Sequence, residues 1–237
     1  MTFCAKLARL TLLPALLAAS AAGAAPQVPD TLAQRLAACT SCHARKDAQG
    51  TPGTDRYFPR ISGKPAGYLY NQLVNFREGR RQYPLMTWMV DHMPDAYLRE
   101  IADYFANDHL PYPAPTPADV PAAVLERGRQ LATRGDTTLK VPACMACHGQ
   151  QLTGVAPAIP GLAGLPRDYI NAQFGAWRNK VRRAHAPDCM ATIAARLSVA
   201  DVAAVSSWLS SQPVPADASP VRSVTRPLPL ACGSSPD

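Results

Sequence analysis

Apolar residues recur at helical spacing in two similar segments of the chain. In residues 69–76, leucine, leucine and phenylalanine stand at i, i+4 and i+7, and in residues 170–177 isoleucine, phenylalanine and tryptophan repeat these intervals. This spacing predicts a helix with one buried face in each segment. A second helix with a single apolar stripe is predicted after each, over residues 98–105 and 202–209. Because no segment shows the alternation typical of a half-buried strand, the chain is predicted to be all-α.

These helices belong to a longer internal repeat. Residues 58–63 match residues 159–164, and a cluster of basic residues follows the first helix of each half. Two further pairs of residues are matched, Tyr68 with Tyr169 and Gln72 with Gln173. The chain is therefore predicted to contain two related domains, since a repeat of this length corresponds to a whole folding unit.

Proline-rich segments divide these domains. Residues 111–123 are predicted to form an extended linker between an N-terminal domain, residues 25–110, and a C-terminal domain, residues 124–211. Residues 212–237 are again rich in proline and lack an apolar period, which predicts an irregular tail.

The first 24 residues have the features of a secretory signal peptide. Lys6 and Arg9 precede an apolar stretch, residues 10–19, which is followed by a run of small residues. The apolar stretch is interrupted by Pro14 and is short for a membrane span, so a retained anchor is not favoured. We therefore expect export to the periplasm, a compartment in which disulfides are tolerated.

A Cys-x-x-Cys-His pentapeptide occurs once in each half. Its residues are Cys39, Cys42 and His43 in the first copy and Cys144, Cys147 and His148 in the second. This spacing is typical of covalent c-type haem attachment, in which two thiols add to the haem vinyl groups and the histidine binds the iron. A thioredoxin-like redox pair would not require the histidine, and a four-coordinate zinc site would leave two of the six donors unused. Two copies in an exported chain predict two covalently bound c-type haems.

The remaining cysteines form one pair. Of seven cysteines, Cys4 lies in the leader and four belong to the attachment motifs, which leaves Cys189 and Cys232. In an oxidising compartment these two predict a disulfide that ties the tail to the second domain. Two alternatives stay open. The pair could be free thiols, or Cys189 could bind haem iron as a thiolate, because it stands beside a candidate axial ligand.

The sixth iron ligand separates an electron carrier from a substrate-binding haem, because a strong-field ligand closes the open position. In the second half, Met190 is the only methionine outside the attachment motif. In the first half, alignment on the last helix selects Met86 and assigns Met89 and Met93 to core packing. Three histidines are alternative ligands, namely His92, His109 and His185. We predict Met86 and Met190 as the sixth ligands.

The chain resembles the diheme cytochrome c4 family, two fused class I-type cytochrome c domains, over nearly its whole mature length. The resemblance is carried by the two attachment motifs, residues 58–63 and 159–164, the helices that follow them and residues 86–89. It implies one histidine and one methionine ligand in each half. It also implies that Pro59 and Pro160 offer backbone carbonyls to the proximal histidines, which would orient each imidazole. The chain departs from the family pattern at Ala44, where the family usually has glycine, and in its proline-rich tail.

Charge bears on the choice of partner. The chain has a net charge of +7, or +5 once Lys6 and Arg9 are removed with the leader. A basic protein is suited to transient docking on an acidic surface of a redox protein partner, including peripheral association with a membrane respiratory complex. Export and the lack of a recognisable nucleic-acid-binding motif argue against nucleic acid. The basic clusters can equally be solvated helix faces.

The sequence thus predicts an electron-transfer protein and not an enzyme. It would carry single electrons in the periplasm between a respiratory donor and a terminal oxidase or another redox partner. One alternative is a diheme enzyme, such as a thiosulfate dehydrogenase or a peroxidase, which Cys189 would favour as an iron ligand. Another is the cytochrome subunit of a dehydrogenase complex, a role that the extra tail would suit.

Overall fold

The computed structural model describes residues 30–43, 58–223 and 227–235. The predicted signal peptide lies outside these residues, as does Ala44. The chain divides into two units, Met1–Arg35 and Leu36–Asp237. In the first unit the described residues form one short helix, α1 (Leu32–Arg35), and the Thr31 hydroxyl accepts a hydrogen bond from the backbone N–H of Gln34 at 3.3 Å. The second unit contains both attachment motifs.

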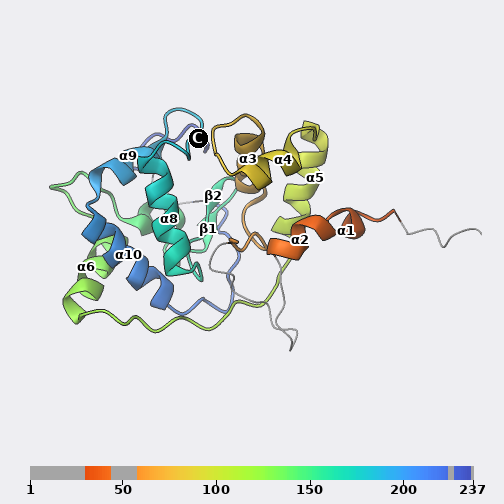
Figure 1. The fold of residues 1–237 in the computed structure, drawn as a ribbon. Helices are drawn as coiled ribbons and strands as arrows, with labels where there is room; N and C mark the ends of the chain where they lie inside the picture. Colours follow the sequence, from red (N-terminus) through yellow and green to blue (C-terminus); the bar gives the residue numbers. More distant parts are fainter. Residues whose placement is uncertain (1–29, 44–57, 224–226, 236–237) are drawn as a thin grey trace, which may run out of the picture. The chain divides into compact units, whose positions relative to one another are not determined.

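The described residues of the second unit are mainly helical, which confirms the all-α class (Figure 1). Its N-terminal half contains α2 (Ala37–His43), α3 (Ala66–Arg77), α4 (Pro84–Val90) and α5 (Asp95–Ala106). Its C-terminal half contains α6 (Ala122–Thr133), α7 (Cys144–His148), α8 (Arg167–Arg178), α9 (Cys189–Arg196) and α10 (Val199–Ser211). Two short strands, β1 (Gly154–Val155) and β2 (Ile159–Pro160), pair antiparallel between α7 and α8.

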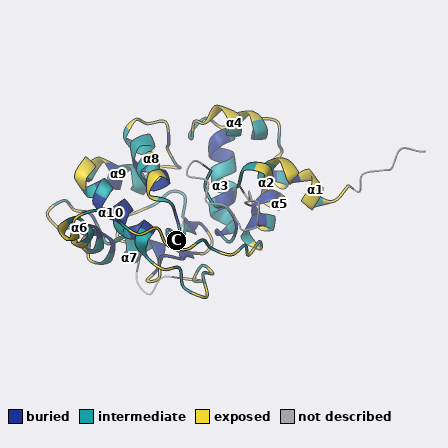
Figure 2. Cartoon of the chain, turned by 60° about the horizontal axis from the view of Figure 1, so that its bottom comes forward, coloured by how far each residue is buried: buried dark blue, intermediate teal, exposed yellow. Residues whose placement is uncertain are grey.

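Helices α3 and α5 pack against each other in the N-terminal half. The stripe predicted for α5 is buried as expected (Figure 2). Leu98 and Phe105 in this stripe are almost wholly enclosed. In α3 the prediction was partly wrong, because Leu73 is only half-buried while Val74 beside it is buried. Since α3 contacts both α4 and α5, its buried face is wider than the single stripe that a helical period describes.

Helix α10 is the centre of the C-terminal half, where it contacts both α6 and α8. A Cβ atom added to Gly128 of α6 would lie 2.2 Å from the carbonyl oxygen of Ala204 in α10, so only glycine allows the two backbones to approach this closely. Helix α10 begins with a capping box in which Ser198 and Asp201 satisfy each other's backbone N–H groups. This cap fixes where α10 starts after α9.

The linker and the tail both contact the helical halves. Residues 108–119 have no regular secondary structure, and the guanidinium of Arg60 lies over the Tyr112 ring, with 3.8 Å between Cζ and the ring centroid. In the tail, Val221 pairs with Val155 of β1, and its carbonyl accepts a hydrogen bond from the Ala156 N–H at 2.8 Å. The proline-rich tail is therefore held by backbone hydrogen bonds where non-proline residues supply them.

Membrane-spanning length was assessed for the helices of the described residues. None of them alone is long and apolar enough to cross a bilayer, whereas α9 and α10 taken together pass by length and composition but are bent by 114° at their junction.

Candidate haem sites

The first attachment motif occupies helix α2, and His43 is its last residue. The Nδ1 atom of His43 donates a hydrogen bond to the carbonyl oxygen of Pro59 at 2.9 Å. Burial lowers the pKa of His43, and the Pro59 carbonyl opposes this effect only in part. The imidazole is therefore neutral near pH 7, with its proton on Nδ1 and the lone pair of Nε2 available to a metal.

The second motif repeats this arrangement on α7. The Nδ1 atom of His148 donates to the carbonyl oxygen of Pro160 at 2.7 Å. Pro160 ends strand β2, and its pairing with Gly154 holds the carbonyl in place beside α7. Burial lowers the pKa of His148, against an upward effect of the Pro160 carbonyl, so this imidazole is also neutral with Nε2 free.

The four motif cysteines form no disulfide and are half-buried. Burial raises the pKa of Cys144 to about 12 and also raises those of Cys147 and Cys39. Both motifs are described, and neither belongs to a group of three or more His, Cys, Asp or Glu side chains that could hold a metal ion. Free thiols beside a histidine with an open Nε2 fit a haem that brings its own iron and is attached through two thioethers.

The two predicted methionine ligands lie on corresponding helices. Met86 is on α4, which packs against α3, and Met190 is on α9, which packs against α8. Both side chains are half-buried, and Met190 packs against the hydrophobic core of the C-terminal half. The correspondence is one of position in the repeat, so iron ligation by Met86 and Met190 stays a prediction.

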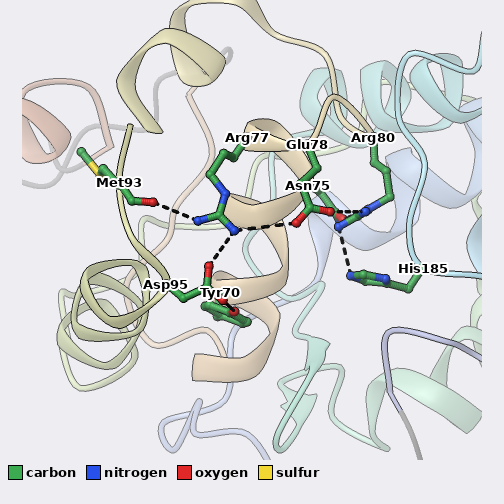
Figure 3. A network of polar contacts seen from close by, with 8 residues as sticks. All are labelled: Tyr70, Asn75, Arg77, Glu78, Arg80, Met93, Asp95 and His185. Atoms are coloured by element: carbon green, nitrogen blue, oxygen red, sulfur yellow. Dashed lines mark hydrogen bonds and ion pairs between the residues drawn. The ribbon is translucent and has the colours of Figure 1, made fainter. Parts of the chain in front are cut away.

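The region after α4 shows how Met93 is held (Figure 3). Arg77 of α3 donates to the carbonyl oxygen of Met93 at 2.9 Å and also binds the carboxylate of Asp95 at 2.6 Å. Tyr70 donates to the other oxygen of the same carboxylate at 2.9 Å. These contacts anchor the backbone at Met93 and the start of α5 to α3, and core packing of the Met93 side chain stays a prediction.

The three alternative histidine ligands lie at the surface. The side chain of His92 is 95% exposed, and His109 and His185 are exposed as well. Nε2 of His185 accepts a hydrogen bond from Arg80 at 3.1 Å (Figure 3). The structure brings none of these three histidines into the protein core.

Cys189 and Cys232 are joined by a disulfide, with their Cα atoms 5.1 Å apart. The bond connects the first residue of α9 to the tail. Gly233, the next residue of the tail, donates from its backbone N–H to the carbonyl of Pro187 at 3.0 Å. The Cys189 sulfur is thus committed to a covalent bond and is not a free thiolate beside Met190.

Two arginines join the halves, a relationship that the sequence analysis did not identify. Arg81 donates to Oε1 of both glutamines in the repeat, Gln72 and Gln173, at 2.9 Å each. Arg182 donates to the same oxygen of Gln173 at 2.7 Å and to the hydroxyl of Tyr68 at 3.3 Å. The internal repeat was the available signal, because the tyrosines, glutamines and arginines that meet here occupy equivalent positions in the two halves.

The pKa values of residues in this cluster are shifted by burial and by the two guanidinium charges. Burial and the charge of Arg81 lower the pKa of Arg182. Burial alone would raise the pKa of Tyr169, but the guanidinium groups of Arg81 and Arg182 outweigh it and lower that pKa. Two cations, of which Arg182 is buried and Arg81 half-buried, therefore share oxygen acceptors at the junction of the halves.

Two attachment motifs, each with its histidine oriented by a prolyl carbonyl, define a c-type cytochrome with two haems. A family model described as cytochrome c matches residues 125–213. The thiosulfate dehydrogenase electron acceptor of Thiomonas intermedia is 35% identical over 178 residues, which cover 75% of this chain and 80% of that protein. Cytochrome c4 of Thiocapsa roseopersicina is 30% identical over 192 residues, which cover 78% of this chain and 94% of that protein.

A solved structure adds to these relatives. Thiosulfate dehydrogenase (TsdBA) from Marichromatium purpuratum matches with a TM-score of 0.64 and 29% identity, over 74% of this chain and 36% of that longer chain. The chain belongs to the diheme cytochrome c4 family. It carries two covalently bound c-type haems in two tandem cytochrome c-like domains, which confirms the predicted cofactors and architecture.

Proposed function

We propose that this cytochrome c4-like electron carrier accepts single electrons from a thiosulfate-oxidising dehydrogenase in the periplasm and passes them to a respiratory partner. Each attached haem supplies one-electron chemistry between ferric and ferrous iron. The protein itself would provide attachment, axial ligands and a docking surface, and it would not bind or convert a substrate of its own.

The axial ligands in this proposal are His43 with Met86 and His148 with Met190. The histidine assignments are supported by the hydrogen bonds from Nδ1 of His43 and His148 to the prolyl carbonyl oxygens, at 2.9 Å and 2.7 Å. Such a bond fixes the ring so that the Nε2 lone pair points toward the metal, and it makes Nε2 a stronger ligand. Methionine as the sixth ligand would favour the ferrous state and raise the reduction potential.

The observation that carries the choice of carrier over enzyme is the disulfide between Cys189 and Cys232. A Cys189 thiolate on the second iron was the feature that favoured a catalytic haem. With that sulfur bonded to Cys232, Met190 is the sulfur donor of α9 that stays free to bind iron, and a haem with two strong protein ligands has no open position for a substrate.

The choice of donor is supported by the relatives. One relative is named an electron acceptor of thiosulfate dehydrogenase, and part of a chain named a thiosulfate dehydrogenase shares this fold. The net charge of +5 that remains once Lys6 and Arg9 are removed suits an acidic partner surface.

An apolar docking surface is available on the N-terminal half. Trp88, Leu85 and Tyr83 are 75%, 49% and 46% exposed, and all three lie in or beside α4, the helix of Met86. Backbone hydrogen bonding of Gln82 to the Val181 carbonyl at 2.7 Å brings basic residues of the second half close to this surface, among them Lys180 and Arg183. An apolar centre with a basic rim suits transient docking of a partner with acidic residues around its own electron exit.

The test is a stopped-flow measurement on the purified holoprotein. Mixed with thiosulfate alone, the ferric protein should stay oxidised. Addition of a catalytic amount of thiosulfate dehydrogenase should reduce both haems rapidly, and raising the salt concentration should slow the reaction. Reduction by thiosulfate without the dehydrogenase would instead establish an enzyme, and reduction no faster than that of an unrelated monohaem cytochrome would reject this donor.

Gel filtration of the protein with the dehydrogenase separates a free carrier from a bound subunit. A carrier should elute apart from the enzyme at physiological salt, because electrostatically guided complexes of electron carriers are weak and small in area. Co-elution of the two proteins would favour the subunit role.

A further inference from the structure

Lys64 belongs to the N-terminal half but ends beside the histidine of the C-terminal half. Its side chain is only 4% exposed, and Nζ donates a hydrogen bond to the carbonyl oxygen of Gly161 at 2.8 Å. Gly161 directly follows Pro160, whose carbonyl accepts the hydrogen bond from His148. The lysine nitrogen is therefore held one peptide unit from the group that orients His148.

The junction of the two halves encloses this nitrogen. The N–H of Tyr68, in the first turn of α3, donates to the carbonyl of Pro157 at 3.3 Å. A Cβ atom added to Gly67 would lie 2.7 Å from the same carbonyl oxygen. The start of α3 thus contacts the loop between β1 and β2 directly. Lys64, two residues before α3, is buried at this contact.

Few charged or titratable groups of the described residues lie near Lys64. Burial, and to a smaller extent the positive charge of Arg60, lower the pKa of Lys64 to about 7. From helix α7 the titratable group that interacts with Lys64 is His148, whose own pKa is lowered mainly by burial and to a smaller extent by the charge of Lys64. The carboxylate of Asp108 lies near the same segment but accepts its hydrogen bond from Ser62.

The internal repeat shows that Lys64 has no charged counterpart at the equivalent position of the C-terminal half. When residues 58–63 are aligned with residues 159–164, Lys64 corresponds to Leu165. Leu165 is buried among the apolar side chains of the C-terminal half and carries no charge. Among the described residues, the second haem centre has a lysine of the opposite half near its histidine, whereas the cation that acts on His43 is Arg81 of its own half.

We propose that Lys64 is a positioning residue for the second haem, where its charge raises the reduction potential above that of the first haem and couples reduction to proton uptake. The proposal rests on His148 as an iron ligand, as proposed above. A nearby positive charge disfavours the ferric state, which carries one more positive charge than the ferrous state.

The coupled reaction balances in charge and atoms. When the haem is bound, the one electron it would take from the redox partner would be matched by one proton, which the neutral amine of Lys64 would bind from solvent. On loss of that electron to the acceptor, Lys64 would return the proton to solvent. Because protonated Lys64 dominates at low pH, the second potential should be high there and should fall as the pH rises through about 7.

The experiment is a redox titration of the native holoprotein from about pH 6 to about pH 8, with the two haems followed separately by NMR through the resonances of their axial methionines. The second centre should become harder to reduce as the pH rises, while the first centre changes little. A pH-independent second centre, or equal pH dependence at both centres, would overturn the proposal. Native protein without methionine resonances would contradict the ligand assignment instead, which keeps the two failures distinct.

Three variants separate charge from hydrogen bonding. Lys64→Leu copies the residue of the other half, Lys64→Gln keeps a donor for the Gly161 carbonyl without a charge, and Arg134→Gln removes one exposed charge elsewhere. At a fixed electrode potential and pH 6, both Lys64 variants should lower the ratio of reduced to oxidised second haem by roughly tenfold, as loss of a unit charge in a partly dehydrated interior would do. The Arg134 variant should leave it nearly unchanged.

Two other patterns among these variants would reject the role proposed for Lys64. A shift in Lys64→Leu but not in Lys64→Gln would show that the lysine serves only as a hydrogen-bond donor. An equal shift in Arg134→Gln would show a general effect of net charge. Either result rejects the role proposed for Lys64. The haem content of each variant, read from its optical spectrum, confirms that both centres are assembled before the titration is interpreted.

Discussion

Arg81 and Arg182 occupy opposed positions in an isolated antiparallel β-bridge, and both guanidinium groups donate to the same oxygen of Gln173, at 2.9 Å and 2.7 Å. Their like charges repel, yet the shared acceptor and the hydroxyls of Tyr68 and Tyr169 hold them together. The junction of the two halves is therefore a polar network whose members depend on one another.

Substitution of these arginines should reveal that dependence. Arg182→Gln should destabilise the holoprotein by about 1–3 kcal/mol, because the half-buried oxygens of Gln173 and Tyr68 each lose a charged donor. Arg81→Gln should act similarly, but the double variant should lose less than the sum of the two, since the arginines share an acceptor and repel each other. Denaturant unfolding of the four proteins measures this, and strictly additive losses would contradict a shared network.

The methionine assignments can be tested by truncation. Met190→Ala should lower the potential of the second haem by on the order of tenths of a volt, because axial ligands tune haem potentials over a range of about 0.8 V, and it should let added imidazole bind. Met86→Ala should do the same at the first haem. Met89→Ala is the matched control on α4, and it should keep the native optical spectrum. A native spectrum in either of the first two variants would reject that assignment.

The docking surface can be tested through its largest exposed side chain. Trp88→Ala should slow reduction by thiosulfate dehydrogenase by roughly fivefold or more, because tryptophans dominate the binding energy of many interfaces. The potentials of both haems should not change. Val199→Ala is the control, since Val199 is also 75% exposed but lies at the start of α10. Equal rates for the two variants in stopped-flow mixing would place the docking site elsewhere.

Two helical glycines should respond oppositely to alanine. Gly128→Ala forces a Cβ atom against the Ala204 carbonyl at 2.2 Å, and we expect a loss of stability of about 1–3 kcal/mol. Gly175→Ala, within α8, meets no atom within 4 Å and should stabilise the protein by about 0.5–1 kcal/mol through helix propensity. Thermal unfolding distinguishes them, and a stabilised Gly128→Ala would contradict the close approach of α6 and α10.

Stability should also depend on pH through Lys64. Since its folded pKa of about 7 lies below that of an unfolded lysine, the unfolded chain binds more protons between these values, and stability rises with pH in that window. The native protein should thus gain up to a few kcal/mol relative to Lys64→Leu between about pH 7 and about pH 10. Parallel pH profiles of the two proteins in denaturant unfolding would show that the buried amine does not titrate.

Some features of the fold could be read from local spacing, whereas others depended on packing. The apolar stripe of α5 was correctly predicted because this helix packs mainly against α3 among the described helices and buries one face there. In helix α3 the burial of Leu73 and Val74 differs from the predicted stripe. This helix contacts both α4 and α5, and a single helical period does not describe two buried faces. The motif histidines were likewise local predictions. The resemblance to the cytochrome c4 family implied that Pro59 and Pro160 contact them, and the folded chain contains both hydrogen bonds.

By itself the sequence determined that this protein binds two haems, because attachment requires two thiols and an imidazole within five residues, and that it is built from two helical halves. The tertiary structure alone decided which side chains meet between the halves. Lys64 reaches Gly161 across 97 positions of the chain, and Arg81 reaches Gln173 across 92. Such contacts depend on how two surfaces pack and exclude water, and no spacing along the chain specifies that.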